Sequence, residues 1–228
     1  MHYKIYGTGI PLVFLHGWGG DSDSMLAIAR AFFATNRVIL VDFEHNAIPN
    51  TPLDLDHYTD GVKDILNKLG VVDAYFICHS FGGRVGVRLT SRFPFLARGL
   101  VLIDSAGLKP RRGIKYHFKV FLHKILKKLG KSGLSGSADF SALAPTQKAT
   151  FINIVNDFTD RDLEYINIPV LVLWGAKDRD TPLYMAKRYK RKLKNCTLKV
   201  FKNAGHFSYL DNCSETIALI KTYIANNE

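Results

Sequence analysis

The chain alternates short apolar runs with longer segments of helical periodicity, and this alternation constrains its fold more than any other feature. The apolar runs are predicted strands, at residues 3–6, 12–15, 37–41, 74–78, 99–103, 170–174 and 198–201. Helical patterns lie between them, at residues 24–33, 55–69, 81–92, 182–193 and 214–224. Such alternation is typical of βαβ units, whose strands form a largely parallel sheet. The sequence therefore predicts an α/β fold with a mostly parallel sheet of about seven strands.

The length and the apolar content indicate one compact domain that spans residues 1–228. A chain of 228 residues can bury a sizeable core, and 47% of its residues are hydrophobic. Every apolar run is shorter than the roughly 20 residues that a membrane-spanning helix needs. The first apolar run leads directly into a glycine-rich turn, unlike the cleavage site of a signal peptide. We therefore expect neither a transmembrane segment nor an export signal.

The three cysteines, Cys78, Cys196 and Cys213, are an odd number and form no CxxC pair. They have no nearby histidine at zinc-ligand spacing, so we expect no metal site. Reduced thiols are typical of the cytoplasm, where we expect this protein to reside. A disulfide between Cys196 and Cys213 is the alternative to buried, apolar thiols.

The alternation breaks once, between residues 106 and 167, where strand patterns are missing. Helical patterns lie there on either side of a glycine- and serine-rich stretch at residues 131–137. An insertion that follows a strand end can cover the carboxyl edge of the sheet, where ligands bind in open α/β sheets. We therefore predict that residues 106–167 form a helical lid within the single domain.

Basic residues concentrate in the first half of this insertion. The formal net charge of the chain is +11, and nine lysines and arginines lie between Ser105 and Ala138 without an acidic residue. Apolar residues recur there at helical spacing, which predicts an amphipathic basic helix whose apolar side chains, including Phe118 and Leu122, line a substrate pocket. Weak contact with an anionic membrane surface, or attraction of acidic substrates, is the alternative to a solvated basic face. Nucleic acid is not an expected partner, because no segment resembles a recognition module.

A serine lies in a tight predicted turn between a strand and a helix. The strand that ends at Cys78 is followed by His79-Ser80-Phe81-Gly82-Gly83. A turn of this kind lifts the serine oxygen away from the backbone, and glycines are needed beside it because side chains would clash. The usual pattern is G-x-S-x-G, and Cys78 replaces its first glycine. We predict that Ser80 is a nucleophile, with an ordinary glycine-rich turn as the alternative.

A second glycine-rich turn, His16-Gly17-Trp18-Gly19-Gly20, directly follows a predicted strand. Where a nucleophile occupies such a strand–helix turn, the next N–H and an N–H from an earlier loop form the oxyanion hole. This assigns the two donors to the main chain of Trp18 and Phe81. We expect the Trp18 side chain to bind substrate as a pocket wall, and His16 to hold the loop in shape.

A carboxylate and a histidine each follow a later predicted strand. Asp178 comes after residues 170–174, and His206 comes after residues 198–201. The order Ser, Asp, His is the one that a nucleophile turn of this type requires. An imidazole can take the serine proton, and a buried carboxylate fixes the imidazole tautomer. We assign His206 as the base and Asp178 as the acid that orients it.

Two other aspartates compete with Asp178 for this role. Asp104 also ends a predicted strand, and Asp180 lies two residues beyond Asp178. We place Asp178 first because of its WGxxD spacing, and Asp104 second. Asp180 is expected to cap the helix that begins at Pro182.

Four segments of the chain, HGWGG, CHSFGG, WGAKD and AGHFSYLD, together resemble the α/β-hydrolase superfamily. The resemblance covers essentially the whole chain except the insertion, and it implies a triad of Ser80, Asp178 and His206. The short lid and the last motif are similar to small bacterial carboxylesterases, monoacylglycerol-lipase-like enzymes and meta-cleavage-product hydrolases. The chain departs from the family pattern after residues 37–41, where glycines are missing. Glu44 and His45 in this stretch belong either to the pocket rim or to a surface loop.

Together these residues predict a serine hydrolase without a cofactor. It would cleave carboxylic esters of small to medium, fairly apolar substrates through an acyl-enzyme on Ser80. The alternatives are hydrolysis of a carbon–carbon bond and lipase-like action at a surface. A non-catalytic ligand-binding protein on the same scaffold is a further alternative, because a fold does not determine a function.

Overall fold

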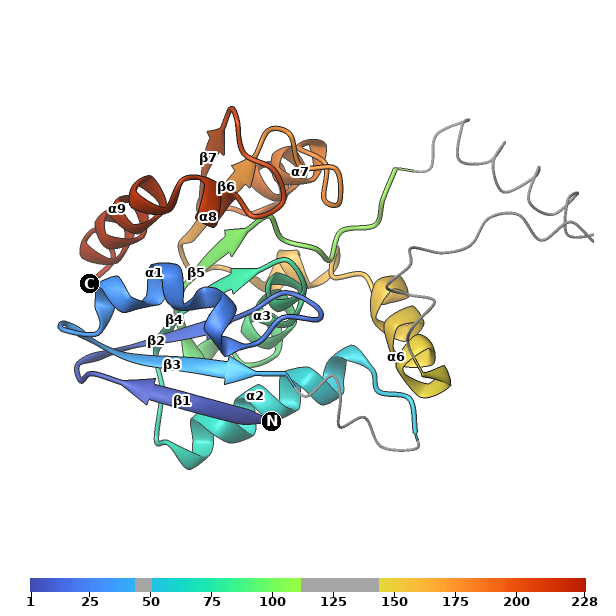
Figure 1. Cartoon of the computed structure of the whole chain (residues 1–228), viewed down its shortest axis with the longest axis horizontal. Helices are drawn as coiled ribbons and strands as arrows, with labels where there is room; N and C mark the ends of the chain where they lie inside the picture. Colours follow the sequence, from blue (N-terminus) through green and yellow to red (C-terminus); the bar gives the residue numbers. More distant parts are fainter. Residues whose placement is uncertain (44–50, 112–143) are drawn as a thin grey trace, which may run out of the picture.

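The computed structural model describes residues 1–43, 51–111 and 144–228, and a seven-stranded sheet forms its centre (Figure 1). The strands are β1 (His2–Tyr6), β2 (Ile10–Leu15), β3 (Asn36–Asp42), β4 (Ala74–His79), β5 (Ala97–Ile103), β6 (Val170–Gly175) and β7 (Cys196–Phe201). They follow the spatial order β1-β3-β2-β4-β5-β6-β7. β1 runs antiparallel to β3, and the other neighbouring pairs are parallel. The predicted, mostly parallel sheet of seven strands is confirmed.

Helices cover both faces of this sheet. The α-helices are α1 (Leu26–Ala29), α2 (Leu55–Lys68), α3 (Phe81–Arg92), α6 (Pro145–Asn156), α7 (Tyr184–Lys192), α8 (Ser208–Asp211) and α9 (Cys213–Ala225). Short 3-10 helices are η1 (Ser22–Met25), η2 (Arg30–Phe32), η3 (Pro94–Leu96) and η4 (Asp162–Tyr165). α2, α3 and α7 pack on one face, and α1 and α9 pack on the other (Figure 1).

The core has two layers because successive residues of a strand point to opposite faces of a sheet. On β2, Val13 and Leu15 belong to the layer beneath α2 and α3. Leu12 and Phe14 belong to the layer beneath α1 and α9. All four side chains are buried. A strand buried on both faces forms a continuous apolar run, and this explains why the sequence pattern located the strands.

The ends of α2 follow directly from its sequence. Asp54 Oδ1 accepts a hydrogen bond from His57 N at 2.9 Å, which caps the first turn. Gly70 follows the last turn with a φ of 62°, a left-handed conformation that glycine adopts without strain. Both ends of α2 thus lie within one residue of the helix predicted at residues 55–69.

The segment predicted as one helix at residues 24–33 consists of three shorter pieces, η1, α1 and η2. The Phe32 ring packs against Phe14 of β2, with ring centroids 6.3 Å apart. The next residue, Phe33, stacks on Tyr6 of β1 at 4.3 Å. Two consecutive aromatic side chains thus contact different strands, and the tighter 3-10 turns direct them there. The continuous helix was therefore a wrong prediction.

Two arginines of α3 connect the described end of the insertion to the rest of the domain. The Arg84 guanidinium donates to the main-chain oxygens of Ile154 and Asp157, at the C-terminal end of α6. Arg88 forms ion pairs with Asp157 at 2.8 Å and Asp162 at 2.9 Å. The lid role of residues 106–167 stays a prediction, because residues 112–143 lie outside the described residues. Among the helices that the structure describes, none is both long and apolar enough to cross a bilayer.

Candidate active site

The three predicted catalytic residues lie at the carboxyl edge of the sheet. Ser80 follows β4, Asp178 follows β6 and His206 follows β7. The carboxyl ends of parallel strands meet at one edge of a sheet, so residues far apart in the chain come together there. The structure brings all three side chains into one connected group.

Ser80 occupies the turn between β4 and α3 with a φ of 49° and a ψ of −110°. This conformation is unfavourable for a residue that carries a side chain. The turn is held by Ser80 N, which donates to Ile103 O at 3.1 Å, and by Gly82 N, which donates to His16 O at 3.0 Å. A side chain at Gly82 would collide with the main-chain carbonyl of Leu15. The close approach of β2 therefore requires glycine at position 82.

Cys78 takes the place of the first glycine in the usual pattern, and a glycine on α3 makes room for it. The Cys78 side chain is fully buried at the end of β4. A β-carbon at Gly86 would lie only 2.6 Å from Cys78 Sγ. The missing side chain at Gly86 thus compensates, within the same strand–helix unit, for the larger residue at position 78.

Hydrogen bonds join the three side chains in series. His206 Nδ1 lies 2.9 Å from Asp178 Oδ2, and His206 Nε2 lies 2.9 Å from Ser80 Oγ. A carboxylate only accepts hydrogen bonds, so Nδ1 carries the proton and Nε2 offers its lone pair to the Ser80 hydroxyl. This tautomer is the one that a general base needs in order to take a serine proton.

Asp178 is buried, and several donors hold it as a carboxylate. Asp180 N and Thr181 N donate to Oδ1 at 2.8 and 2.9 Å, and Thr181 Oγ1 donates to Oδ2 at 2.6 Å. Burial favours a higher pKa, but the hydrogen bonds from His206 and Thr181 hold the pKa of Asp178 below its usual value. Burial also opposes protonation of His206, yet the bond to Asp178 raises the pKa of His206. The arrangement therefore favours a positive charge on His206.

Asp104, the first rival acid, binds main-chain groups rather than the imidazole. Its Oδ1 accepts a hydrogen bond from Gly175 N at 2.8 Å, and its Oδ2 accepts one from Ser208 N at 3.0 Å. The side chain is fully buried, and burial raises the pKa of Asp104 to about 7. The geometry thus places Asp178, and not Asp104, on His206.

Asp180, the second rival, does not cap the following helix, so that prediction is wrong. α7 begins at Tyr184, and its N-cap residue, Leu183, makes no capping bond through its side chain. The chain first makes a tight turn around the Asp178 carboxylate, which holds the N–H groups of Asp180 and Thr181. This turn uses the residues that the sequence pattern assigned to the start of the helix.

His16 holds the glycine-rich loop after β2, as predicted. His16 Nδ1 lies 2.7 Å from Gly17 O, and His16 Nε2 accepts the Phe43 N–H at 3.0 Å. Burial lowers the pKa of His16, which favours a neutral ring that donates from Nδ1. The ring thereby ties the loop to the end of β3.

Trp18 and Phe81, the predicted oxyanion donors, lie on segments that face each other. Their rings meet edge-on with centroids 5.4 Å apart. Phe81 is the first residue of α3, where the helix dipole stabilises negative charge. The Trp18 ring also contacts Phe151 of α6, with centroids 5.4 Å apart. The role of both residues in an oxyanion hole stays a prediction.

A cavity of about 350 Å³ opens beside Ser80. Its lining residues are Gly17, Trp18, Gly19, Gly20, Ser24, His79, Ser80, His206, Phe207 and Tyr209. The cavity is thus bounded by the loop after β2 and by the segment that carries His206. Its volume lies near the lower end of the range for small-molecule sites.

His79 is a cavity residue that sequence reasoning missed. His79 Nε2 lies 2.9 Å from the main-chain oxygen of His206, to which it donates. Burial lowers the pKa of His79 to about 4, so the ring is neutral near pH 7. The ring also contacts Phe207 and Tyr209, with centroids 5.2 and 4.9 Å away. A polar residue at the end of an otherwise apolar strand was the only sequence signal for this role.

Within the described parts of the chain, one group of residues has spacing suitable for a metal ion, and it lies at this site. Ligand atoms of Asp178, Asp180 and His206 lie within 4.8 Å of one another. Asp178 and His206 already bind each other, and Asp178 also receives N–H and O–H donors. These contacts fit a hydrogen-bonded triad better than a metal site.

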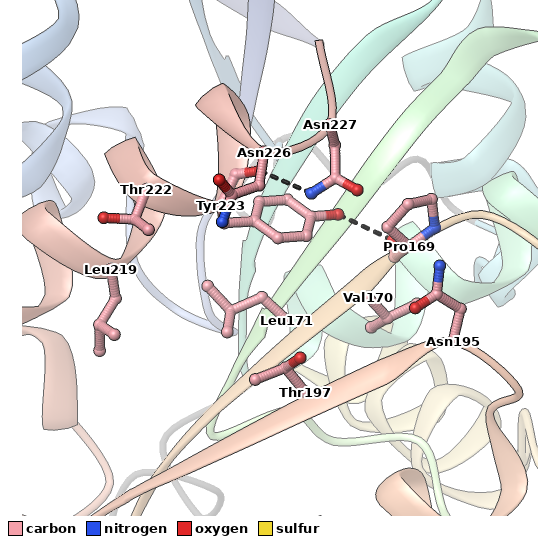
Figure 2. Close-up of a pocket in the computed structure, with 10 residues that line it drawn as sticks. All are labelled: Pro169, Val170, Leu171, Asn195, Thr197, Leu219, Thr222, Tyr223, Asn226 and Asn227. Atoms are coloured by element: carbon pink, nitrogen blue, oxygen red, sulfur yellow. Dashed lines mark hydrogen bonds between the residues drawn. The ribbon is translucent and has the colours of Figure 1, made fainter.

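A second hollow, of about 260 Å³, lies at the amino end of β6 and β7, beside α9 (Figure 2). The Tyr223 hydroxyl there donates to Pro169 O at 2.7 Å and accepts the Leu100 N–H at 3.0 Å. Asn227 Nδ2 donates to Tyr223 O at 2.6 Å (Figure 2). The two bonds of the Tyr223 hydroxyl attach α9 to the sheet, and the lining of this hollow includes none of the predicted site residues.

Some predicted residues lie outside the described parts of the chain. Phe118 and Leu122, predicted to line the pocket, belong to this group, as do Glu44 and His45. The basic helix with predicted membrane contact falls in the same undescribed range. These assignments stay predictions.

Comparison with known proteins places the chain in a family. Residues 12–219 match the Alpha/beta hydrolase family. The chain is 24% identical to the 2-hydroxymuconate semialdehyde hydrolase of Pseudomonas putida, over 96% of this chain and 88% of that protein. It is also 24% identical to the strigolactone esterase D14 of Arabidopsis thaliana, over 92% and 91%. A bromoperoxidase structure from Bacillus anthracis has a TM-score of 0.78 and 20% identity, covering 98% of this chain and 94% of that one. The chain therefore belongs to the alpha/beta hydrolase family.

Proposed function

We propose that this protein is a serine hydrolase that cleaves carboxylic esters of small to medium, fairly apolar substrates. The observation that carries the proposal is the hydrogen-bonded series of Ser80, His206 and Asp178 beside a cavity. Both relatives named above are hydrolytic enzymes by name, and one of them is an esterase. A hydrolase is thus the general class, and ester cleavage on Ser80 is the specific proposal.

The proposed reaction is acyl transfer. Ser80 Oγ attacks the ester carbonyl carbon while His206 Nε2 takes the hydroxyl proton, and the N–H groups of Trp18 and Phe81 bind the resulting oxyanion. His206 then passes the proton to the leaving alkoxide, and the acyl group stays on Ser80. Next, His206 deprotonates a water that attacks the acyl-enzyme, and Ser80 leaves with the proton. Asp178 stabilises the charged imidazole in both steps, and the proposed reaction uses no cofactor.

The substrate class follows from the walls of the cavity. Trp18 and Phe207 are apolar walls next to Ser80, and a volume of about 350 Å³ suits a small acyl or alcohol group. The Phe151 ring on the Trp18 ring places α6 of the insertion beside this wall. A lid formed by residues 106–167, with Phe118 and Leu122 over the pocket, is part of the proposal.

A fluorophosphonate probe and a panel of p-nitrophenyl esters with graded acyl length test this function. We expect the probe to label the wild type and Ser91→Ala, a matched change on α3, but not Ser80→Ala. Hydrolysis should be fastest for short to medium acyl chains and absent in Ser80→Ala. Labelling of Ser80→Ala at the wild-type rate would refute the nucleophile. Tight ligand binding without labelling of the wild type would instead indicate a binding protein.

Carbon–carbon bond hydrolysis is the second candidate, because one relative is a 2-hydroxymuconate semialdehyde hydrolase. The same series of Ser80, His206 and Asp178 is available to either reaction. A ring-fission dienoate, assayed beside p-nitrophenyl butyrate, separates the two. Faster turnover of the dienoate would favour this candidate over the esterase.

We also propose a cytoplasmic location. All three cysteines are free, which fits a reducing compartment, and the alternative disulfide between Cys196 and Cys213 is not formed. Cys78 and Cys196 are buried, as the apolar interpretation of the thiols requires. Contact of the basic helix with anionic membranes is a separate proposal, which vesicle binding with and without anionic lipid would test.

A further inference from the structure

A buried carboxylate that the proposed reaction does not use lies close to both Asp178 and His206. Asp104 is fully buried at the end of β5, with a φ of 45°. Gly175, whose N–H binds Oδ1, is the last residue of β6 and directly precedes the loop that carries Asp178. Ser208, whose N–H binds Oδ2, begins α8 two residues after His206. One side chain thus binds both of the segments that present the acid and the base.

We propose that Asp104 is a positioning residue, which holds Asp178 and His206 in place relative to each other by binding the two segments that carry them. This proposal rests on the proposed function. Asp104 acts through the N–H groups of Gly175 and Ser208 and does not touch the substrate. Thr181 adds a link between the same parts, since its hydroxyl donates to Asp178 and lies 3.1 Å from Asp104 O.

The role depends on a carboxylate, because both oxygens accept from a buried main-chain N–H. An asparagine has one acceptor oxygen and one donor amide, so it would leave one of the two N–H groups facing another donor. A buried donor without a partner is costly, and the segment that carries it would move. Asp104→Asn is therefore a change of nearly equal shape that removes one link.

The charge of Asp104 also acts on the groups that face it. These groups are Asp178, His206 and Tyr209. The ionised Asp104, together with Asp178, raises the pKa of His206, whereas Asp178 favours the protonated form of Asp104. Loss of the Asp104 charge should therefore lower the pKa of His206. A purely structural side chain would leave the pKa of the base unchanged.

The first test compares Asp104→Asn with Asp160→Asn, a control in which a carboxylate that also accepts a main-chain N–H is removed from the insertion. We expect Asp104→Asn to react with the fluorophosphonate probe roughly 10- to 100-fold more slowly, because small displacements of catalytic groups cost that much. The acid limb of its labelling rate and the His206 imidazole titration, followed by NMR, should both move to lower pH. Asp160→Asn should match the wild type in both.

The second test needs no variant, so it holds even if Asp104→Asn fails to fold. The amide protons of Gly175 and Ser208 should titrate together in the wild type, as both bind one carboxylate. Different midpoints for these two amide protons would overturn the proposal. So would an Asp104→Asn protein with the wild-type labelling rate and His206 titration. If Asp104→Asn is inactive while Asp178→Asn is active, Asp104 is the orienting acid instead. Absent labelling of the wild type would refute the serine hydrolase, and the NMR result for Asp104 would still stand.

Discussion

Ser80 is held in a backbone conformation that costs on the order of 1–3 kcal/mol for a residue with a side chain. The neighbouring strands offset this cost, because Ser80 N donates to Ile103 O and Gly82 N donates to His16 O. The result is a hydroxyl that lies 2.9 Å from His206 Nε2. Strain in the chain is thus coupled to the geometry that the proposed reaction requires.

The role of Asp178 is tested at the same scale by Asp178→Asn. The amide can donate to His206 Nδ1, which would favour the tautomer with the proton on Nε2, so the base could not take the Ser80 proton. Loss of the same interaction in a serine protease costs about 10⁴-fold in kcat, and we expect a drop of that order here. Ester hydrolysis by Asp178→Asn and by the neighbouring control Asp180→Asn measures it. Full activity in Asp178→Asn would mean that another residue orients the base.

The sequence could locate Ser80, Asp178 and His206 because each follows a predicted strand and their order matches the chemistry. It ranked Asp178 ahead of Asp104 only by the WGxxD spacing, since both aspartates follow strands. What separates them is which carboxylate reaches His206 Nδ1, and that depends on how the loops fold over one another. The sequence also could not predict that His79 is neutral near pH 7, because burial in the folded chain lowers its pKa.

The unit formed by β4 and α3 shows how one element adapts to another. Cys78 Sγ occupies the space that a side chain at position 86 would need. The cysteine that replaces the first glycine of the usual pattern is therefore accommodated by a glycine at position 86. In the sequence, Cys78 looked like a defect in the motif. The compensation lies one helical turn beyond Gly82, and only the packing of the helix on the strand reveals it.

Gly86→Ala should therefore be destabilising even though alanine favours helices. The new methyl group would overlap Cys78 Sγ, and overpacking of this kind costs about 1–3 kcal/mol of unfolding free energy. In Cys78→Ala/Gly86→Ala the overlap with residue 78 is gone, because the new β-carbon lies 3.5 Å from the β-carbon there, and only the 3.3 Å contact with Leu100 Cδ1 is left. Urea unfolding of both single variants and the double variant measures the coupling. Strictly additive costs would show that the two side chains do not compete for space.

Elements with a clear period and a clear cap were predictable, whereas those shaped by tertiary contacts were not. α3 matches its predicted range of 81–92, and α2 ends one residue before the end of its predicted range of 55–69. The segment at residues 24–33 has helical periodicity, yet Phe32 and Phe33 pack on different strands and break it into short turns. The short α8 beside the site also escaped prediction, because four residues carry too little periodicity.

Two buried ionisable groups of the molecule, His79 and Asp104, have opposite effects on the pH dependence of its stability. Burial lowers the pKa of His79 from 6.5 to about 4, so stability is full above pH 6.5 and is lost as the pH falls toward 4. Burial raises the pKa of Asp104 from 3.8 to about 7, so its contribution is full below pH 3.8 and is lost as the pH rises toward 7. The pH ranges in which the two groups change the unfolding free energy overlap, and the two changes with pH have opposite signs. Between pH 4 and pH 7 the two contributions therefore largely cancel.

Replacing His79 should change how the unfolding free energy of the chain depends on pH. Glutamine cannot be protonated in this range but can donate to the His206 carbonyl. His79→Gln therefore removes the loss of unfolding free energy at low pH and keeps the hydrogen bond to His206 O. Relative to the wild type, its unfolding free energy should rise by about 3 kcal/mol from pH 7 to pH 4, since each pKa unit is worth about 1.4 kcal/mol. Urea unfolding at several pH values measures this difference, and Thr222→Ala, a change of an exposed and uncharged side chain of α9, should keep a constant offset. A constant offset for His79→Gln would show that the fold does not hold His79 neutral, and the acid sensitivity would then have another source.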